Sequence, residues 1–413
     1  MKILFLDAYF EPESTSFTHL EKDIIEGLIQ SGHEIFVVCP TPTRGISGDV
    51  AEKYRKIKKE DMYGGRVHVE RFWAPQEKRN PLVRAFRYFW CNFRQKAVAK
   101  KYKDVDLIFS ASTPPTQGLM CGKVKKKLGV PFVFTLQDIF PDSLVTAKMT
   151  RKGSLIWKLG RKIENATYKN ADRIIVISED FKRNIMGKGV SEEKISVISN
   201  WVDSSEVYPI ERKDNILFSR YGLDPDKYYI CYSGNIGHSQ NMRMLLDTAK
   251  ELKTELPDVR FVLIGDGAAK EEVSSVIENE GIDNVTLLPF QPYEDIAYVF
   301  SLGDAGLIIS KPGIGNSSVP SKTWSIMAAA RPVICSFDDD SALSKLIREA
   351  GCGVTAQAEE GTEAFKKAIY ELYNNKEKNA EIGALGRKYL TEYLDKDKCV
   401  GMYVETIKNI DRK

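Results

Sequence analysis

Short hydrophobic stretches alternate with longer amphipathic ones along almost the whole chain. Apolar or β-branched runs come first at residues 2–8, 34–40, 67–73, 106–112, 132–138, 173–179 and 194–200. After a break, further runs follow at 228–234, 260–266, 285–290, 305–311, 332–337 and 353–357. Buried runs separated by helical patterns are typical of βαβ units with parallel strands. The pattern therefore predicts an α/β fold.

The break in this series predicts how the chain divides. One parallel sheet rarely contains so many strands, so we expect two Rossmann-like domains facing across a cleft. Residues 201–227 are polar and turn-rich. We place the first domain at 1–203, a linker at 204–224 and the second domain at 225–374. Residues 375–413 have a helical pattern without a strand, and we expect this tail to pack back on the first domain.

Composition narrows the class of protein. The 413 residues are 43% hydrophobic and 28% charged, as in soluble globular proteins, and the net charge of +3 gives no general reason to bind nucleic acid. Seven scattered cysteines without CxxC spacing predict reduced thiols, and four histidines apart from them argue against a zinc site. No apolar run of about 20 residues is present. The start, "MKILFLDAYF", is interpreted as a buried strand rather than a signal peptide.

The loop "SKPGIGNSSVPSK" at residues 310–322 is the first candidate for chemistry. Gly313 and Gly315 allow positive φ and close backbone approach to a ligand. Ser321 is a suitable N-cap, and we predict a helix from Lys322 to Ala330. The first helical amides, the helix dipole and Lys322 would form an anion site. An ordinary helix start with an exposed lysine is the alternative.

Two further glycine-bearing loops follow strands of the same predicted domain. Gly234 ends the run at 228–234, with Asn235 and Gly237 just after it, and Gly265 lies near the end of the run at 260–266, with Gly267 just after it. Ligands of such sheets bind beyond the carboxyl ends of the strands. Three loops of this kind suggest a nucleotide pocket, although any one of them is more often a simple turn.

Several motifs together give the chain a family resemblance. They are "ILFLDAYFEPE", "TLQDIFPDS", "ADRIIVIS", "VISNWVD", "YSGNIG", "LIGDG" and "VPSKTWSIMAAARPVI". In this order and spacing they resemble retaining GT-B glycosyltransferases of bacterial polysaccharide assembly, nearest the N-acetyl-L-fucosamine transferases of O-antigen and capsule synthesis. The resemblance implies a nucleotide sugar, usually UDP-linked, on the second domain and the acceptor on the first. It implies no cofactor and no metal.

The resemblance also implies which residues form the site. Where the family usually has two glutamates this chain has Ser317 and Ser325, and where it often has a basic pair this chain has Asn235 and Gln240. The charged candidate for the diphosphate is then Lys322. The expected donor residues are Gly234, Asn235, Gln240, Gly265, Phe290, Gly313, Ser317, Pro320, Ser321, Lys322 and Ser325, and the expected acceptor side is Phe10, Pro12 and Glu13.

Two acidic segments have competing interpretations. Asp338–Asp340 resembles the Asp-x-Asp metal motif of another glycosyltransferase fold, but its place before a predicted helix favours N-capping. Asp138 ends the run at 132–138, where a carboxylate is costly unless it is paired or functional. We expect Asp138 to orient the donor sugar or the acceptor hydroxyl; Gln137 replaces the family's usual histidine.

Residues 80–101 predict a basic aromatic helix. Leu82, Phe86, Phe89 and Phe93 share a stripe, with Arg84, Arg87 and Arg94 on the other side. Such a stripe either faces the core or docks on anionic lipid, with "KVKKK" at 123–127 adding basic surface. The expected protein is a glycosyltransferase with a lipid-linked acceptor, peripheral to the inner face of the cell membrane in the cytoplasm. Alternatives are a nucleotide-sugar epimerase of the same fold and a non-catalytic nucleotide-sugar-binding subunit.

Overall fold

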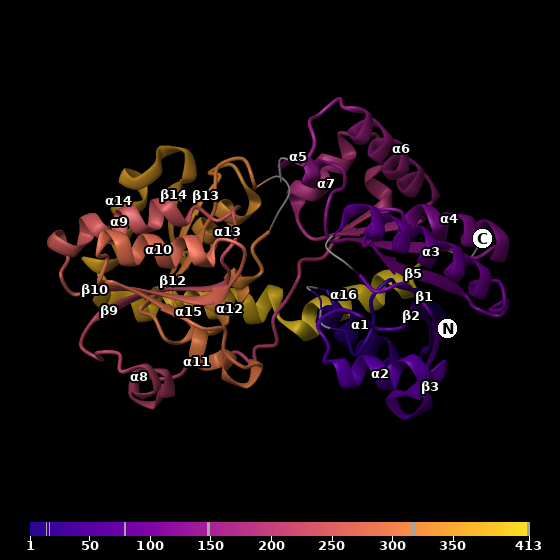
Figure 1. Ribbon diagram of the computed structural model, residues 1–413, viewed down its shortest axis with the longest axis horizontal. Helices are drawn as coiled ribbons and strands as arrows, with labels where there is room; N and C mark the ends of the chain where they lie inside the picture. The colour runs from indigo at the N-terminus through magenta and orange to yellow at the C-terminus, as the bar shows by residue number, and fades with distance from the viewer. Residues whose placement is uncertain (14, 16, 78–79, 147–148, 316–318, 411–413) are drawn as a thin grey trace. The chain divides into compact units, whose positions relative to one another are not determined.

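The chain folds into two compact α/β units. The computed structural model describes all residues except 14, 16, 78–79, 147–148, 316–318 and 411–413. Unit 1 consists of Met1–Ser199 with Cys399–Lys413, and unit 2 consists of Asn200–Lys398. Each unit has its own parallel sheet with helices packed against it (Figure 1). The predicted fold class, two Rossmann-like parallel-sheet domains, is confirmed.

The sheet of unit 1 has eight strands within the described residues, in the order β3-β4-β2-β1-β5-β6-β7-β8. All neighbours pair in parallel except β3 with β4. The strand β3 was not predicted, because its sequence KEDM is almost entirely charged and it lies at the sheet edge. The strands are β1 Lys2–Leu6, β2 Glu34–Pro40, β3 Lys59–Met62, β4 Val67–Phe72, β5 Leu107–Ala111, β6 Phe132–Leu136, β7 Arg173–Val176 and β8 Ile195–Val197.

Helices cover both faces of this sheet. The helices α3, α4 and α6 lie on one face, where α4 packs between α3 and α6. On the opposite face α1 packs on α16 so closely that a Cβ on Gly27 would lie 2.3 Å from the Val400 side chain. The helices are α1 Thr18–Gln30, α2 Gly48–Lys56, α3 Pro81–Ala99, α4 Gln117–Leu128, α5 Asp142–Thr146, α6 Leu155–Asn170, α7 Glu179–Met186 and α16 Lys396–Lys408.

The sheet of unit 2 has six parallel strands in its described part, in the order β11-β10-β9-β12-β13-β14. The strands are β9 Tyr228–Asn235, β10 Val259–Asp266, β11 Val285–Leu288, β12 Ala305–Ile309, β13 Val333–Phe337 and β14 Gly353–Gln357. The helices are α8 Ile216–Tyr221, α9 Met242–Glu255, α10 Lys270–Glu280, α11 Ile296–Phe300, α12 Lys322–Ala328, α13 Ala342–Ala350, α14 Gly361–Tyr373 and α15 Asn379–Tyr389.

Short helical turns complete the described structure. The 3-10 turns are Tyr63–Gly65, Glu192–Lys194, Arg212–Asp214, Tyr293–Asp295, Ala358–Glu360 and Lys376–Lys378, and Leu390–Leu394 is π-helical. All seven cysteines are buried and none forms a disulfide. No helix among the described residues combines the length and the apolar character needed to cross a bilayer.

The division of the chain differs from the predicted one in two places. The expected linker 204–224 belongs to unit 2, where Leu217 and Phe218 of α8 pack against Tyr229 and other buried residues. The expected tail is split: α15 and the π-helical turn belong to unit 2, and only Cys399–Lys413 belongs to unit 1. Leu390 and Leu394 are buried in a cluster with α12, which holds the first part of the tail on unit 2.

Candidate functional site

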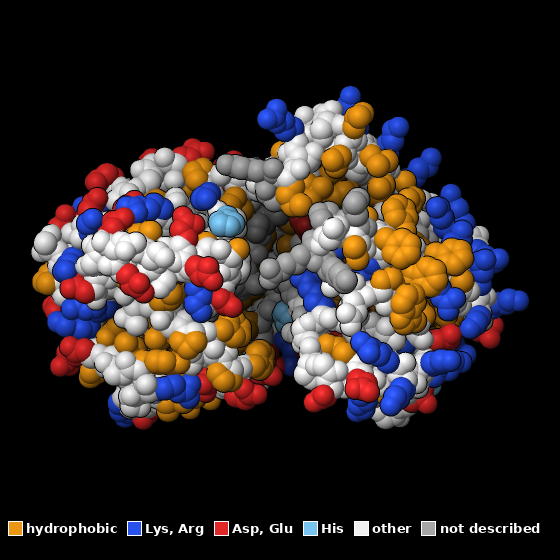
Figure 2. Space-filling model, in the orientation of Figure 1, with side chains coloured by type: hydrophobic (Ala, Val, Ile, Leu, Met, Phe, Trp, Pro, Cys, Tyr) orange, Lys and Arg blue, Asp and Glu red, His pale blue; other side chains and the backbone are white. Residues whose placement is uncertain are grey.

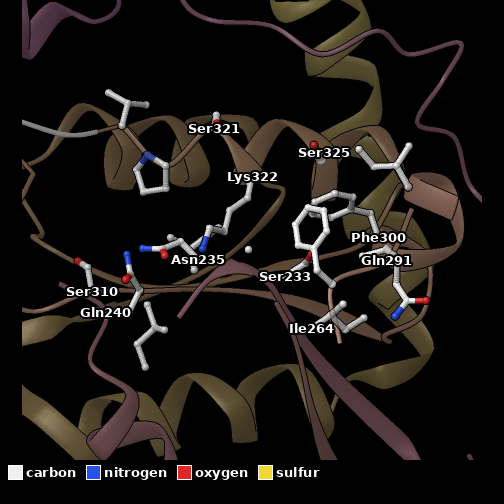
Figure 3. Close-up of a pocket in the computed structure, with 18 of the residues that line it drawn as sticks. Ser233, Asn235, Gln240, Ile264, Gln291, Phe300, Ser310, Ser321, Lys322 and Ser325 are labelled. Carbon is white, nitrogen blue, oxygen red and sulfur yellow. The ribbon is translucent and has the colours of Figure 1, made fainter. Parts of the chain in front are cut away.

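A cavity of about 480 Å³ lies in unit 2 at the carboxyl ends of its strands. The loops after β9, β11 and β12 form its walls together with α11 and the start of α12 (Figure 3). Loops at this edge of a parallel sheet converge, which is why they form binding sites. Of the residues expected for the donor, those that line this cavity are Gly234, Asn235, Gln240, Phe290, Pro320, Ser321, Lys322 and Ser325.

Lys322 supplies the charge of this cavity. Its side chain extends from α12 toward the loop after β9, and its Nζ lies 3.8 Å from the centre of the Tyr232 ring (Figure 3). Among the described lining residues Lys322 is the only one with a basic side chain, and none is acidic. Burial lowers the pKa of the Lys322 ammonium to about 7. An anionic ligand would supply the missing counter-charge and stabilise the protonated form.

Gly234 allows the backbone to pass close to this ammonium. It has φ 131°, and a Cβ there would lie 3.3 Å from the Lys322 Nζ. Gly265 has a different role from the predicted one, because a Cβ there would lie 1.9 Å from the Gly234 carbonyl oxygen. Gly265 does not line the cavity. The tight spacing of β9 and β10, rather than a ligand, therefore requires glycine at residue 265.

Asn235 and Gln240 occupy the two positions at which the resembling family often has a basic pair. Gln240 accepts a hydrogen bond at Oε1 from the Gly237 backbone N–H at 3.0 Å, which folds the loop after β9. The Tyr232 hydroxyl donates to the Asn235 carbonyl oxygen at 2.6 Å. Both amide side chains line the cavity, so this side of the site offers neutral hydrogen-bonding groups.

The start of α12 differs from its prediction. The helix spans Lys322–Ala328 and stops before Ala330, which has φ 51°. Ser321 makes no capping hydrogen bond and has helical backbone angles, so the N-cap prediction was wrong. Instead, the Thr323 hydroxyl donates to the Pro320 carbonyl at 2.8 Å. The exposed Ser321 side chain remains available at the cavity wall. Ser317 lies outside the described residues.

Asp338 organises the loop before α12. Its carboxylate accepts the backbone N–H groups of Gly313 at 2.7 Å and Gly315 at 2.5 Å. Gly313 thus faces a separate cavity beside Asp338–Asp340 and not the one around Lys322. The cap of α13 is Ser341, whose Oγ accepts from the Ser344 N–H at 3.1 Å, so the predicted capping by the aspartates was wrong. Within the described residues no group of three or more His, Cys, Asp and Glu side chains is arranged to hold a metal ion.

The deeper part of the cavity is apolar and was missed by sequence reasoning. It is lined by Ile264, Ile296, Val299, Phe300, Ile308 and Phe337. These residues come from the helix α11 and the strands β10, β12 and β13, so only the fold brings them together. The only sequence signal was that Ile264, Ile308 and Phe337 lie near the ends of predicted strands. A flat apolar group with polar edges, such as a nucleobase, fits a space of this kind.

Asp138 follows β6 in unit 1, and its side chain is exposed. The protein atoms around the carboxylate displace water and raise its pKa above the ordinary value, and a hydrogen bond with Ser143 opposes this rise. Asp138 lines a cavity of about 20 Å³, room for about one water molecule. The carboxylate is therefore accessible at the surface of unit 1, while the cavity beneath it is too small for a sugar.

The expected acceptor residues are mostly enclosed. Phe10 and Glu13 are 1% and 3% exposed, so their side chains are closed to a ligand, contrary to the prediction. Glu13 accepts the backbone N–H groups of Thr43 at 2.7 Å and Arg44 at 2.9 Å and so fixes the loop after β2. Pro12 is partly exposed.

The aromatic stripe of α3 faces solvent rather than the core. Phe86, Phe89 and Phe93 are 59%, 69% and 65% exposed. Arg87 is buried and donates to the Pro75 carbonyl, so it does not belong to the predicted basic face, whereas Arg84 is exposed. The side chain of Leu82 lies outside the described ones.

Two parallel-sheet units, the second with a ligand-sized cavity at its strand ends, form the architecture of GT-B glycosyltransferases. The chain belongs to this class: residues 22–206 match the family model "Glycosyltransferase Family 4" and residues 213–389 match "Glycosyl transferases group 1".

Individual relatives and structures agree with this assignment. WcaI of Escherichia coli, a glycosyl transferase assigned to colanic acid biosynthesis, is 24% identical over 99% of this chain and 100% of its own. The glycosyltransferase WbjE of Pseudomonas aeruginosa is 26% identical over 70% of this chain and 72% of its own. The structure of Anabaena HepE in complex with UDP superposes with a TM-score of 0.73 at 17% identity, covering 99% of this chain and 100% of that one. At this identity the superposition shows the fold.

Proposed function

We propose that this glycosyltransferase moves a sugar from a UDP-linked donor to a lipid-linked saccharide acceptor in polysaccharide biosynthesis. The observation that carries the proposal is the lone ammonium of Lys322 in a cavity whose described lining has no acidic residue. A diphosphate is an anion that such a site would bind. The colanic acid assignment of WcaI and the UDP bound to HepE support the choice of pathway and nucleotide.

The proposed donor position follows from the polarity of the cavity. The diphosphate would contact Lys322, the exposed Ser321 hydroxyl and the backbone beside Gly234. The uracil would occupy the apolar part near Phe290, and Ser325 would meet the ribose with a hydroxyl. Asn235 and Gln240 would contribute neutral hydrogen bonds.

The proposed chemistry retains the configuration of the donor sugar, which is expected to be a hexose or an N-acetylamino sugar. The bond from the anomeric carbon to the diphosphate oxygen breaks, the acceptor hydroxyl bonds to that carbon on the same face, and its proton passes to the leaving oxygen. Lys322 stabilises the negative charge on the leaving diphosphate. The lysine ammonium thereby takes the place of a metal ion. Asp138 would orient a sugar hydroxyl, and no cofactor is required.

A lipid-linked acceptor requires an enzyme that reaches a membrane surface. We propose that the protein is peripheral to the inner face of the cell membrane and docks through residues 80–101. The exposed stripe of Phe86, Phe89 and Phe93 supports this choice, because a core-facing helix would bury these rings. The nearest branch, the N-acetyl-L-fucosamine transferases, is proposed from the sequence motifs alone.

Product analysis tests the catalytic proposal. UDP-sugars would be incubated with the protein, with and without membrane extracts containing lipid-linked saccharides, and the products identified by mass spectrometry. We expect a lipid-linked product one sugar longer, together with UDP, in the presence of acceptor. An epimerised UDP-sugar without acceptor would indicate the epimerase, and UDP-sugar binding without any turnover would indicate a non-catalytic subunit.

A further inference from the structure

The first two turns of α6 expose aliphatic side chains to an unusual degree. Leu155, Ile156 and Leu159 are 85%, 62% and 61% exposed, and Met149, in the segment before the helix, is 70% exposed. Single exposed apolar residues are normal on protein surfaces, but a cluster of large ones marks an interaction site.

The inward face of α6 explains why these residues point outward. Among the buried residues of α6 are Gly160, Glu164 and Tyr168, and a Cβ on Gly160 would lie 2.7 Å from the Pro141 side chain. Glu164 is satisfied there by the Tyr168 hydroxyl at 2.8 Å and Lys188 Nζ at 2.8 Å. A globular helix normally turns its apolar stripe to the core. In α6 a polar network holds the inner face, so the aliphatic residues of the first turns stay largely uncovered by the described part of unit 1.

The layer of helices α3, α4 and α6 carries charge of almost only one sign, which is positive. The helices α3, α4 and α6 pack side by side, and each contains four Lys or Arg residues. The only acidic residue in the three helices is the buried Glu164. The whole chain has a net charge of only +3, so this layer concentrates positive charge that is balanced elsewhere. Figure 2 shows the hydrophobic side chains gathered over the region of these helices with Lys and Arg at the margin.

We propose that the first two turns of α6 are a second membrane-insertion element, and that the outer surface of α3, α4 and α6 docks as one face on an anionic bilayer. This inference rests on the membrane association proposed above, which α3 alone could provide. The aromatic rings of α3 insert at one end of the face and the aliphatic side chains of α6 at the other. The lysines of α4 between them, including the exposed Lys123, Lys126 and Lys127, meet the lipid phosphates.

An anionic bilayer fits this surface better than a protein or nucleic acid does. Apolar side chains beside exposed lysines match the acyl-chain and headgroup layers of a membrane. Two insertion elements on one rigid layer also bind jointly, since the second enters once the first has anchored the face. A face held at two ends would have a defined orientation on the lipid surface.

Vesicle flotation tests the inference with the full chain. The vesicles contain phosphatidylcholine alone or mixed with phosphatidylglycerol. The α6 variant is Leu155→Ser/Ile156→Ser, the α3 variant is Phe89→Ser/Phe93→Ser, and Leu385→Ser is a control at a 43% exposed leucine on α15. We expect the α6 and α3 variants each to lose roughly tenfold or more in partitioning to the anionic vesicles. The control should float like the unmodified protein, and all variants should keep its melting temperature and UDP affinity.

The outcomes separate this inference from the proposals on which it depends. If the α3 variant loses binding and the α6 variant floats like the unmodified protein, membrane association stands and the α6 element is refuted. If the unmodified protein does not float, both membrane proposals fail, whereas UDP binding by calorimetry still tests the donor site. Equal binding to neutral and anionic vesicles would refute the role given to Lys123, Lys126 and Lys127.

Discussion

Raising the pH from 7 to 9 should weaken UDP binding, because the cation that meets the diphosphate loses its proton in the free protein. Burial lowers the pKa of Lys322 to about 7, against an ordinary value of 10.5. A bound diphosphate stabilises the ammonium and raises this pKa again. Well below pH 7 the lysine is already protonated, so it contributes no further pH dependence to UDP binding. Above pH 7 binding must take up a proton, so the affinity falls.

The size of the effect follows from the same pKa. About half of the free protein carries a protonated Lys322 at pH 7 and about one part in a hundred at pH 9, so UDP affinity should fall about fifty-fold, a little over 2 kcal/mol. Few other groups titrate in this range. The Tyr232 hydroxyl stays neutral because burial raises its pKa, and the described lining contains no histidine or acidic residue. A terminal phosphate, with a pKa of about 6, is already ionised.

Isothermal titration calorimetry measures both the UDP affinity and the number of protons taken up on binding. At pH 8, titrations in two buffers of different ionisation enthalpy should show uptake of close to one proton per UDP bound. The matched control is Lys322→Met, which should bind UDP one to two decades more weakly at pH 7, as expected for losing about 1.5–3 kcal/mol of charge-assisted contact, and without a pH slope above 7. A flat affinity between pH 7 and 9 with no proton uptake in the unmodified protein would refute the placement of the diphosphate at Lys322.

Two other substitutions give direct tests. Asp138→Asn keeps the shape of the side chain and removes its charge, so kcat and kcat/KM for sugar transfer should fall together. UDP affinity should be unchanged, because Asp138 lies in the unit that lacks the donor cavity. Full activity at a normal melting temperature would show that the carboxylate is structural. Gly234→Ala places a Cβ 3.3 Å from the Lys322 Nζ at φ 131°, so we expect lower stability by about 1 kcal/mol or more in thermal unfolding and UDP affinity reduced at least several-fold. An alanine variant with unchanged melting and UDP binding would contradict the close packing of this loop on Lys322.

Local sequence was sufficient for the fold class and for every described strand except β3. A buried parallel strand needs a continuous apolar run, and each of the thirteen predicted runs contains a strand that lies within it or extends one residue beyond it, although β7 and β8 fill only part of theirs. The charged edge strand β3 gave no signal of this kind. Lys322 could also be singled out, because a lysine in the first turn of a helix after a glycine-rich loop is unfavourable without an anion.

Long-range packing decided the rest. A glycine motif cannot tell a ligand from a neighbouring strand, and at Gly265 the neighbour is the Gly234 carbonyl. Leu217 and Leu390 are apolar in segments predicted as linker and tail, and only the fold places them in the core of unit 2. The same limit applies to α3 and α6: periodicity shows that a helix has an apolar stripe, but what covers the stripe depends on residues distant in sequence. Burial is a property of the whole tertiary structure, whereas the pattern records only each residue's affinity for water.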